Sequence, residues 1–140
     1  SEEVRPDDRF YWVRDNNDGT YTSTAKNLND VEEVDREGNL LYVQVWDSET
    51  ESMVDSEERL VTKGLKSQWI SSVKDTANSL LSPTDWYVIR KAERSVDIPA
   101  EVALKRTQIV TEANRLETDI NASITVESLI EALNSQNWGE

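Results

Sequence analysis

The spacing of apolar residues changes once along this chain, at Gly64, and that change limits the folds open to it. Before Gly64, large apolar and aromatic residues alternate with polar ones, which is the period of a half-buried strand. After Gly64, apolar residues recur every three or four positions, as on one face of a helix. We therefore predict an α+β protein, with a small antiparallel β-hairpin region at residues 1–63 and a helical hairpin or bundle at residues 64–140.

Two hairpins are predicted in the first region. Residues 9–24 alternate on both sides of a turn in which Gly19 supplies a positive φ. Residues 31–46 repeat the pattern around a turn at residues 35–38. The stretch that follows, residues 47–58, has no period and is rich in acidic residues, so we expect an exposed linker there.

The second region is predicted to form several helices packed on each other. An amphipathic helix of about five turns begins at Gly64, the longest helix opens at residues 97–101, and Thr125 caps a short last helix before a loose tail at residues 135–140. One helical core is expected. Its predicted members are Leu65, Trp69, Val73, Leu80, Leu81, Trp86, Ile109, Ala113 and Leu116.

The segment "LLSPTDW" at residues 80–86 is predicted to form a sharp corner between two helices. In this interpretation Ser82 is the N-cap of the second helix and Pro83 occupies its first position, where a missing N–H costs nothing. Asp85 then completes a capping box, and Leu81 packs on Trp86 as a hydrophobic staple. The segment is thus interpreted as structural rather than catalytic.

The net charge of −13 is concentrated in residues 1–63, which contain 17 acidic and 7 basic residues. Such a field repels phosphate, so no nucleic-acid binding is expected, and a basic protein surface is the favoured partner. The alternative is an acidic decoy that mimics nucleic acid, but the carboxylates gather in turns and the linker rather than along one face. The locally basic cluster Arg90, Lys91 and Arg94 is interpreted as a solvated helix face.

The chain contains no histidine and no cysteine, which removes the usual general base, the easiest nucleophile and the common zinc ligands. Neither an enzyme nor a cofactor is expected. The loop "RDNNDGT" at residues 14–20 is similar to a calcium-binding loop, but the EF-hand register places Arg14 and Ala25 where carboxylate ligands are needed. No metal site is predicted, and no apolar run is long enough to suggest membrane insertion.

Several aromatic residues lie outside the predicted helical core, and so small a sheet cannot cover all of them. Tryptophan and tyrosine carry much of the binding energy at protein interfaces. Two interpretations stay open, packing within the sheet and exposure as interface anchors. The candidate partner-binding residues are Trp12, Tyr21, Trp46 and Trp138.

One longer pattern joins two leucines, a small residue and Thr-Asp-Trp to a further helix that opens near a proline and carries an arginine. This pattern resembles the tail assembly chaperone-like proteins of tailed bacteriophages, small proteins commonly encoded beside tail-fibre genes. The resemblance spans roughly residues 65–122. The matching residues are Leu80, Leu81, Thr84, Asp85, Trp86, Ile98, Pro99 and Arg106.

The resemblance implies a non-enzymatic phage protein of the tail or tail-fibre region that binds other phage tail or fibre proteins. It would be retained in the virion as a structural protein, or act in the host cytoplasm as an assembly chaperone. We expect the N-terminal β part to bind the partner and the helical unit to serve as its scaffold.

Overall fold

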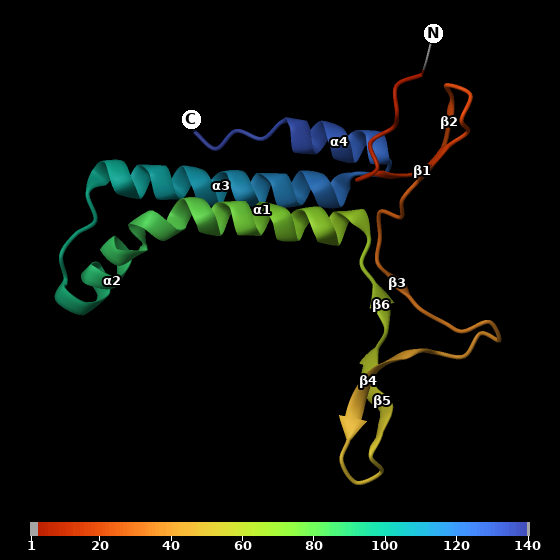
Figure 1. Cartoon of the computed structure of the whole chain (residues 1–140). Helices are drawn as coiled ribbons and strands as arrows, with labels where there is room; N and C mark the ends of the chain where they lie inside the picture. The colour runs from red at the N-terminus through yellow and green to blue at the C-terminus, as the bar shows by residue number, and fades with distance from the viewer. Residues whose placement is uncertain (1–2, 140) are drawn as a thin grey trace.

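The computed structural model describes residues 3–139 and has the predicted α+β organisation, with strands first and helices after them (Figure 1). The elements are β1 (Tyr11–Asp15), β2 (Tyr21–Ala25), β3 (Val31–Glu32), β4 (Tyr42–Asp47), β5 (Ser52–Arg59), β6 (Val61–Thr62), α1 (Leu65–Leu81), the 3₁₀ turn η1 (Ser82–Thr84), α2 (Asp85–Arg94), α3 (Ala100–Ala122) and α4 (Val126–Asn134).

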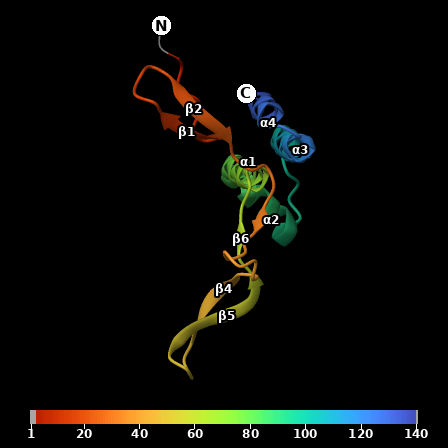
Figure 2. The ribbon, with the colours of Figure 1, turned by 90° about the vertical axis from the view of Figure 1, so that its right-hand side faces the viewer.

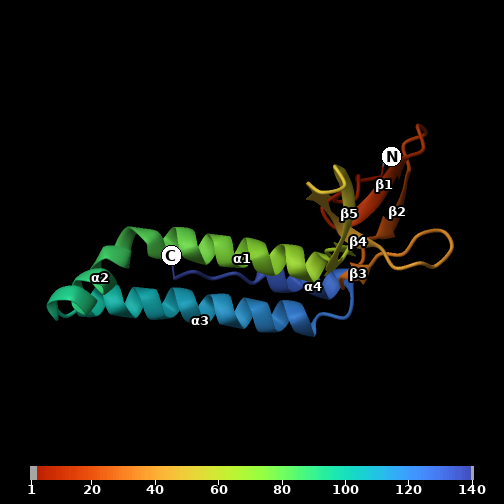
Figure 3. The same ribbon diagram turned by 90° about the horizontal axis from the view of Figure 1, so that it is seen from below.

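The helical body consists of α1 and α3, which run antiparallel, with α4 folded back along α3 (Figures 1 and 3). As predicted, α3 is the longest helix, and the Thr125 side chain caps α4 by accepting a hydrogen bond from the N–H of Ser128 at 3.1 Å. The apolar faces of the three helices meet in one core. Its buried members are Phe10, Leu65, Val73, Leu116, Ile120, Val126, Leu129 and Leu133.

Phe10 brings the N-terminal region into this helical core. Its side chain is only 4% exposed and stacks on Trp69 with 5.3 Å between ring centroids. Tyr11 packs beside it and donates a hydrogen bond to the Glu127 carboxylate on α4. The core therefore draws on both sides of the boundary predicted at residue 63.

The first N–H groups of α1 are satisfied by a segment distant in sequence. The first residues of a helix have no acceptors within the helix itself. Here the N–H of Leu65 donates to the Asn27 carbonyl at 2.8 Å, and that of Lys66 donates to the Leu28 carbonyl at 3.0 Å. Residues 27 and 28 thus fix the point at which α1 begins.

Asp30 completes this cap, and Gly64 makes room for it. The Asp30 carboxylate accepts hydrogen bonds from the N–H of Gly64 and from the hydroxyl of Ser67. Both contacts lower the pKa of Asp30, and the hydrogen bond from the Ser67 hydroxyl has the larger effect. A Cβ at position 64 would lie 2.4 Å from backbone atoms of Asn29, so glycine is required by the close approach of the two segments.

The first predicted hairpin is confirmed. β1 and β2 pair antiparallel from Tyr11 opposite Ala25 to Asp15 opposite Tyr21, and Gly19 in the turn has the expected positive φ of 86°. The second prediction is partly wrong. The turn at residues 35–38 does form, but the strands that pair are β3 with β6 and β4 with β5.

The predicted linker at residues 47–58 is also wrong, because this stretch contains a tight turn and strand β5. The prediction relied on apolar alternation, which β5 lacks. Backbone hydrogen bonds to β4 hold β5 in place, and such bonds leave no mark in the side-chain pattern. Residues 31–62 together form a thin β arm that leaves the N-terminal end of α1 (Figures 1 and 2).

Arg59 lies at the base of the side loop formed by residues 34–40 and holds its two ends together. Its guanidinium donates to the carbonyls of Glu33 and Leu41 and pairs with Glu32 at 3.2 Å. The N–H of Leu60 also donates to the Leu41 carbonyl. One arginine thus joins three segments that carry almost no apolar packing of their own.

The predicted corner is wrong in its details. Ser82 keeps right-handed helical angles, φ −50° and ψ −45°, and its N–H bonds to Asn78 within α1. It therefore cannot act as an N-cap, which needs extended backbone. Pro83 lies in η1, and the Asp85 carboxylate accepts a hydrogen bond from Arg106 instead of closing a capping box.

The predicted staple between Leu81 and Trp86 is wrong for the same reason. Because the chain continues from α1 through η1 without an extended residue, Trp86 is carried to the outside and is 51% exposed. Leu80 and Leu81 are half-buried rather than central. Arg106 on α3 holds the turn by donating to the Leu81 carbonyl and to the Thr84 hydroxyl.

The core can be tested by truncating one buried and one exposed aromatic residue. Phe10→Ala should lower the free energy of unfolding by about 3–5 kcal/mol because it leaves a cavity against Trp69. Trp86→Ala should lower it by at most about 1 kcal/mol, the size of a surface stacking contact. Urea unfolding followed by far-UV circular dichroism measures both. Equal losses, or a larger one at Trp86, would contradict this assignment of the core.

Candidate partner-binding surfaces

The four aromatic residues predicted to bind a partner do not form one surface. Trp12 and Trp46 are exposed, at 67% and 63%, but they lie on different hairpins. Tyr21 is half-buried on β2. Trp138 is half-buried and packs against the helical core, so its predicted place outside that core is wrong.

The end of the β arm presents exposed apolar side chains on both of its strands. Trp46 on β4 stands opposite Met53 on β5, which is 55% exposed, and the pair shares one face of the ribbon. On the other face Val45 stands opposite Val54. An isolated two-stranded hairpin is at best marginally stable in water, so a partner that covered these side chains would stabilise the arm as well as bind it.

The apolar residues of the arm are surrounded by carboxylates. Residues 31–62 contain ten acidic residues and two arginines, a net charge of −8. One arginine, Arg59, is already paired with Glu32. An apolar centre with a charged rim is the usual composition of a protein interface, and here the rim suits a basic surface.

Trp12 presents a different surface. The Lys26 ammonium lies 4.6 Å from the centre of its indole ring, a cation–π contact that covers one face of the ring. Its neighbours in sequence, Phe10 and Tyr11, pack against the helices. Hairpin β1–β2 is thus joined to the helical body at its base, whereas β4 and β5 lie at the far end of the arm (Figure 2).

A third surface, which the sequence interpretation missed, lies on α2 at the opposite end of the helical body from the arm (Figures 1 and 3). We call residues 85–94 the tip. No residue of this helix is buried. Trp86 and Tyr87 stack at 3.8 Å, the Arg90 guanidinium lies 4.9 Å above Trp86, and Ile89 is 56% exposed.

A signal for the tip was present in the sequence. Trp86, Tyr87, Val88 and Ile89 are four consecutive large apolar residues within a helix. One helix face cannot bury four consecutive positions, which are spread over about 300° around the helix axis. Some of these side chains therefore had to be exposed, and the basic cluster at Arg90 lies directly beside them.

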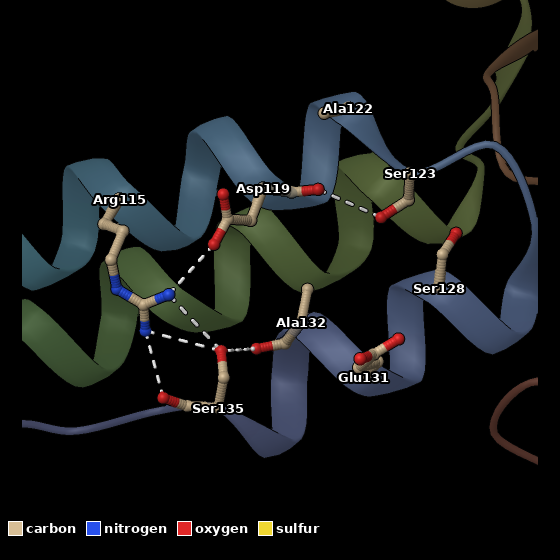
Figure 4. Close-up of a pocket in the computed structure, with 8 residues that line it drawn as sticks. All are labelled: Arg115, Asp119, Ala122, Ser123, Ser128, Glu131, Ala132 and Ser135. Carbon is tan, nitrogen blue, oxygen red and sulfur yellow. Dashed lines mark hydrogen bonds and ion pairs between the residues drawn. The ribbon is translucent and has the colours of Figure 1, made fainter.

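Arg115 joins α3 to α4 and the chain that follows α4 across the polar hollow between these two helices (Figure 4). The Arg115 guanidinium donates to Asp119 at 2.9 Å and to the Ser135 carbonyl at 3.0 Å. It also forms two 2.7 Å hydrogen bonds to the two carboxylate oxygens of Glu112. Through these hydrogen bonds within the protein, Arg115 holds the end of α4 against α3.

Glu112 extends this contact to the C-terminal tail. It is 8% exposed, and its carboxylate accepts a hydrogen bond from the N–H of Asn137 at 2.6 Å. The bonds from Arg115, and then that from Asn137, lower the pKa of Glu112 below its ordinary value. The tail predicted to be loose is therefore anchored, and Trp138 packs against the core beside it.

Within residues 3–139 there is no group of three or more potential ligand side chains close enough to hold a metal ion. In the turn at residues 14–20, which is similar to a calcium-binding loop, Asp15 and Asp18 accept hydrogen bonds from the N–H groups of Asn17 and Thr20. Over the same range, no helix is both long and apolar enough to cross a bilayer.

Comparisons with models of known protein families, with curated proteins and with solved structures found no match for this sequence.

The Glu112 contact predicts a specific pH dependence. Because the folded-state pKa is lowered, its stabilising effect is fully present above the ordinary value of 4.5 and is lost as the pH falls through the folded-state pKa. Glu112→Gln should cost about 1–3 kcal/mol at neutral pH, and the difference from wild type should shrink at about pH 3. Urea unfolding of both proteins at the two pH values measures this.

Glu131→Gln is the matched control. It is the same chemical change at an exposed position on α4. Its effect on the free energy of unfolding should be small at both pH values. A Glu112→Gln effect that stays constant between neutral and acid pH would contradict a lowered pKa.

Proposed function

We propose that this chain is a non-enzymatic, protein-binding component of the tail or tail-fibre region of a tailed bacteriophage. It binds other tail or fibre proteins through the end of the β arm. In this role it is either retained in the virion as a structural protein or present in the host cytoplasm as an assembly chaperone.

The observation that carries this proposal is the exposed pair Trp46 and Met53 at the end of an acidic arm. A two-stranded ribbon is too thin to bury these large side chains, so they stay in contact with water. Docking of a partner would remove their apolar area from water, which favours a binding role. The arm has few other means of stabilisation. A partner with an apolar pocket and a basic rim complements both features of this surface.

The resemblance to phage tail assembly chaperone-like proteins supplies the phage context. Three of its matching residues, Thr84, Asp85 and Arg106, are joined by hydrogen bonds of 2.7 and 2.9 Å. Residues about twenty positions apart in the pattern thus act as one structural unit here. This contact supports treating the pattern as a single motif rather than as a chance combination of helical residues.

A binding assay with the tail and fibre proteins of the phage that carries the gene tests the proposed function. Trp46→Ala should weaken binding at least about tenfold, as for a central aromatic anchor. Two controls define the surface. Trp12→Ala removes an equally exposed tryptophan from the other hairpin, and Glu57→Gln changes one rim charge, so both should bind nearly as wild type. Unchanged binding by Trp46→Ala would contradict the proposal.

Mass spectrometry of purified particles separates the two forms of the proposal. A retained structural protein is found in mature virions at a fixed ratio to other tail proteins. An assembly chaperone is found bound to its partner in infected cells and is absent from the particles.

A further inference from the structure

The tip on α2 has the properties of a binding surface that no part of residues 3–139 covers. Trp86, Val88 and Ile89 are all exposed, and no residue of the helix is buried. A ten-residue helix in water is marginal without tertiary packing, and the tip is held mainly through η1 and Arg106. Its exposed apolar side chains favour contact with another molecule.

The tip is also locally basic in a strongly acidic chain. Arg90, Lys91 and Arg94 form no ion pair with any described residue. Of the two acids in the same helix, Asp85 is already paired with Arg106 at 2.9 Å. An acidic occupant is therefore favoured.

We propose that the tip binds the end of the β arm of a second copy of this chain. The arm carries a net charge of −8 around the exposed residues Trp46 and Met53, and the tip carries basic residues around Trp86 and Ile89. Both the charges and the apolar centres are complementary. The contact joins two different surfaces, so it runs head to tail.

The two surfaces of one molecule cannot meet. The arm leaves one end of the helical body and the tip lies at the other end (Figures 1 and 3). The 17 residues of α1 separate them, a length of about 25 Å at 1.5 Å per residue. Binding must therefore occur between copies, and a head-to-tail contact builds a ring or an open filament.

This inference rests on the proposed function, because it uses the same surface of the arm. A second copy and a tail protein would then compete for the Trp46 face. Self-association would keep that face covered until a tail protein displaces the second copy.

Sedimentation velocity of the purified full-length chain tests the inference. Wild type should form dimers and larger species as its concentration rises, and added salt should reduce them. A tip variant, Arg90→Glu with Arg94→Glu, and an arm variant, Trp46→Ala, should each raise the dissociation constant at least about tenfold. The matched control, Arg14→Glu on β1, changes one exposed charge elsewhere and should associate as wild type.

Mixing the two variants gives the decisive result. The tip variant keeps an intact arm and the arm variant keeps an intact tip, so one interface can still form between them. The mixture should contain a one-to-one dimer and nothing larger. A wild type that stays monomeric up to about 1 mM, or a mixture that forms no dimer, would overturn the inference.

The tip variant also separates this inference from the proposed function. Its arm is intact and its self-association is weakened, so it should bind tail proteins at least as well as wild type does. If the tip variant fails to bind them while the variant mixture still dimerises, the proposed function is wrong and the self-association stands. The opposite pair of results rejects the self-association alone.

Discussion

The first turn of α1 takes its hydrogen-bond acceptors from residues 27–30, and the positions of both β parts depend on this contact. The carbonyls of Asn27 and Leu28 and the carboxylate of Asp30 bind N–H groups that would otherwise need water. Upstream of this segment, hairpin β1–β2 places Phe10 in the helical core. Downstream of it, the chain turns away into the β arm. A single cap thus joins the folded body to its projecting parts.

Two arginines on α3 fix the ends of the helical body in a similar way. Arg106 holds the turn between α1 and α2, and Arg115 holds the end of α4 with the C-terminal tail. Each guanidinium uses its planar set of donors to join carbonyl and carboxylate oxygens from separate segments. These contacts compensate for a core that is modest in size and concentrated near the N-terminal end of α1.

The molecule is consequently polarised, with an acidic arm at one end and a basic tip at the other. Both ends carry exposed tryptophan, Trp46 on the arm and Trp86 on the tip. In the body between them, the facing sides of α1, α3 and α4 form one buried core, although Leu104, Val110 and Ile124 stay exposed. This distribution of charge and exposed tryptophan is the common basis of the two proposals, both of which place binding at the ends.

The sequence by itself determined the order of strands and helices, because the apolar period changes at Gly64 and each period fits one kind of element. It also determined the first hairpin, through Gly19, and the cap of α4, through Thr125, since both signals act on neighbouring residues. The acidity of the front half was likewise plain from the sequence, whereas it left open whether Trp46 is packed or exposed.

Tertiary structure alone decided the pairing of strands, the corner and the full set of exposed aromatics. Strand β5 is held by backbone bonds that no side-chain pattern records, and β3 pairs with a strand about thirty residues later. Ser82 could have capped a helix, but Arg106 holds the chain in continuous helical turns instead. As a result Trp86 points outward. The direction of its side chain depends on Arg106 of α3, twenty positions away, rather than on the residues next to it in the sequence.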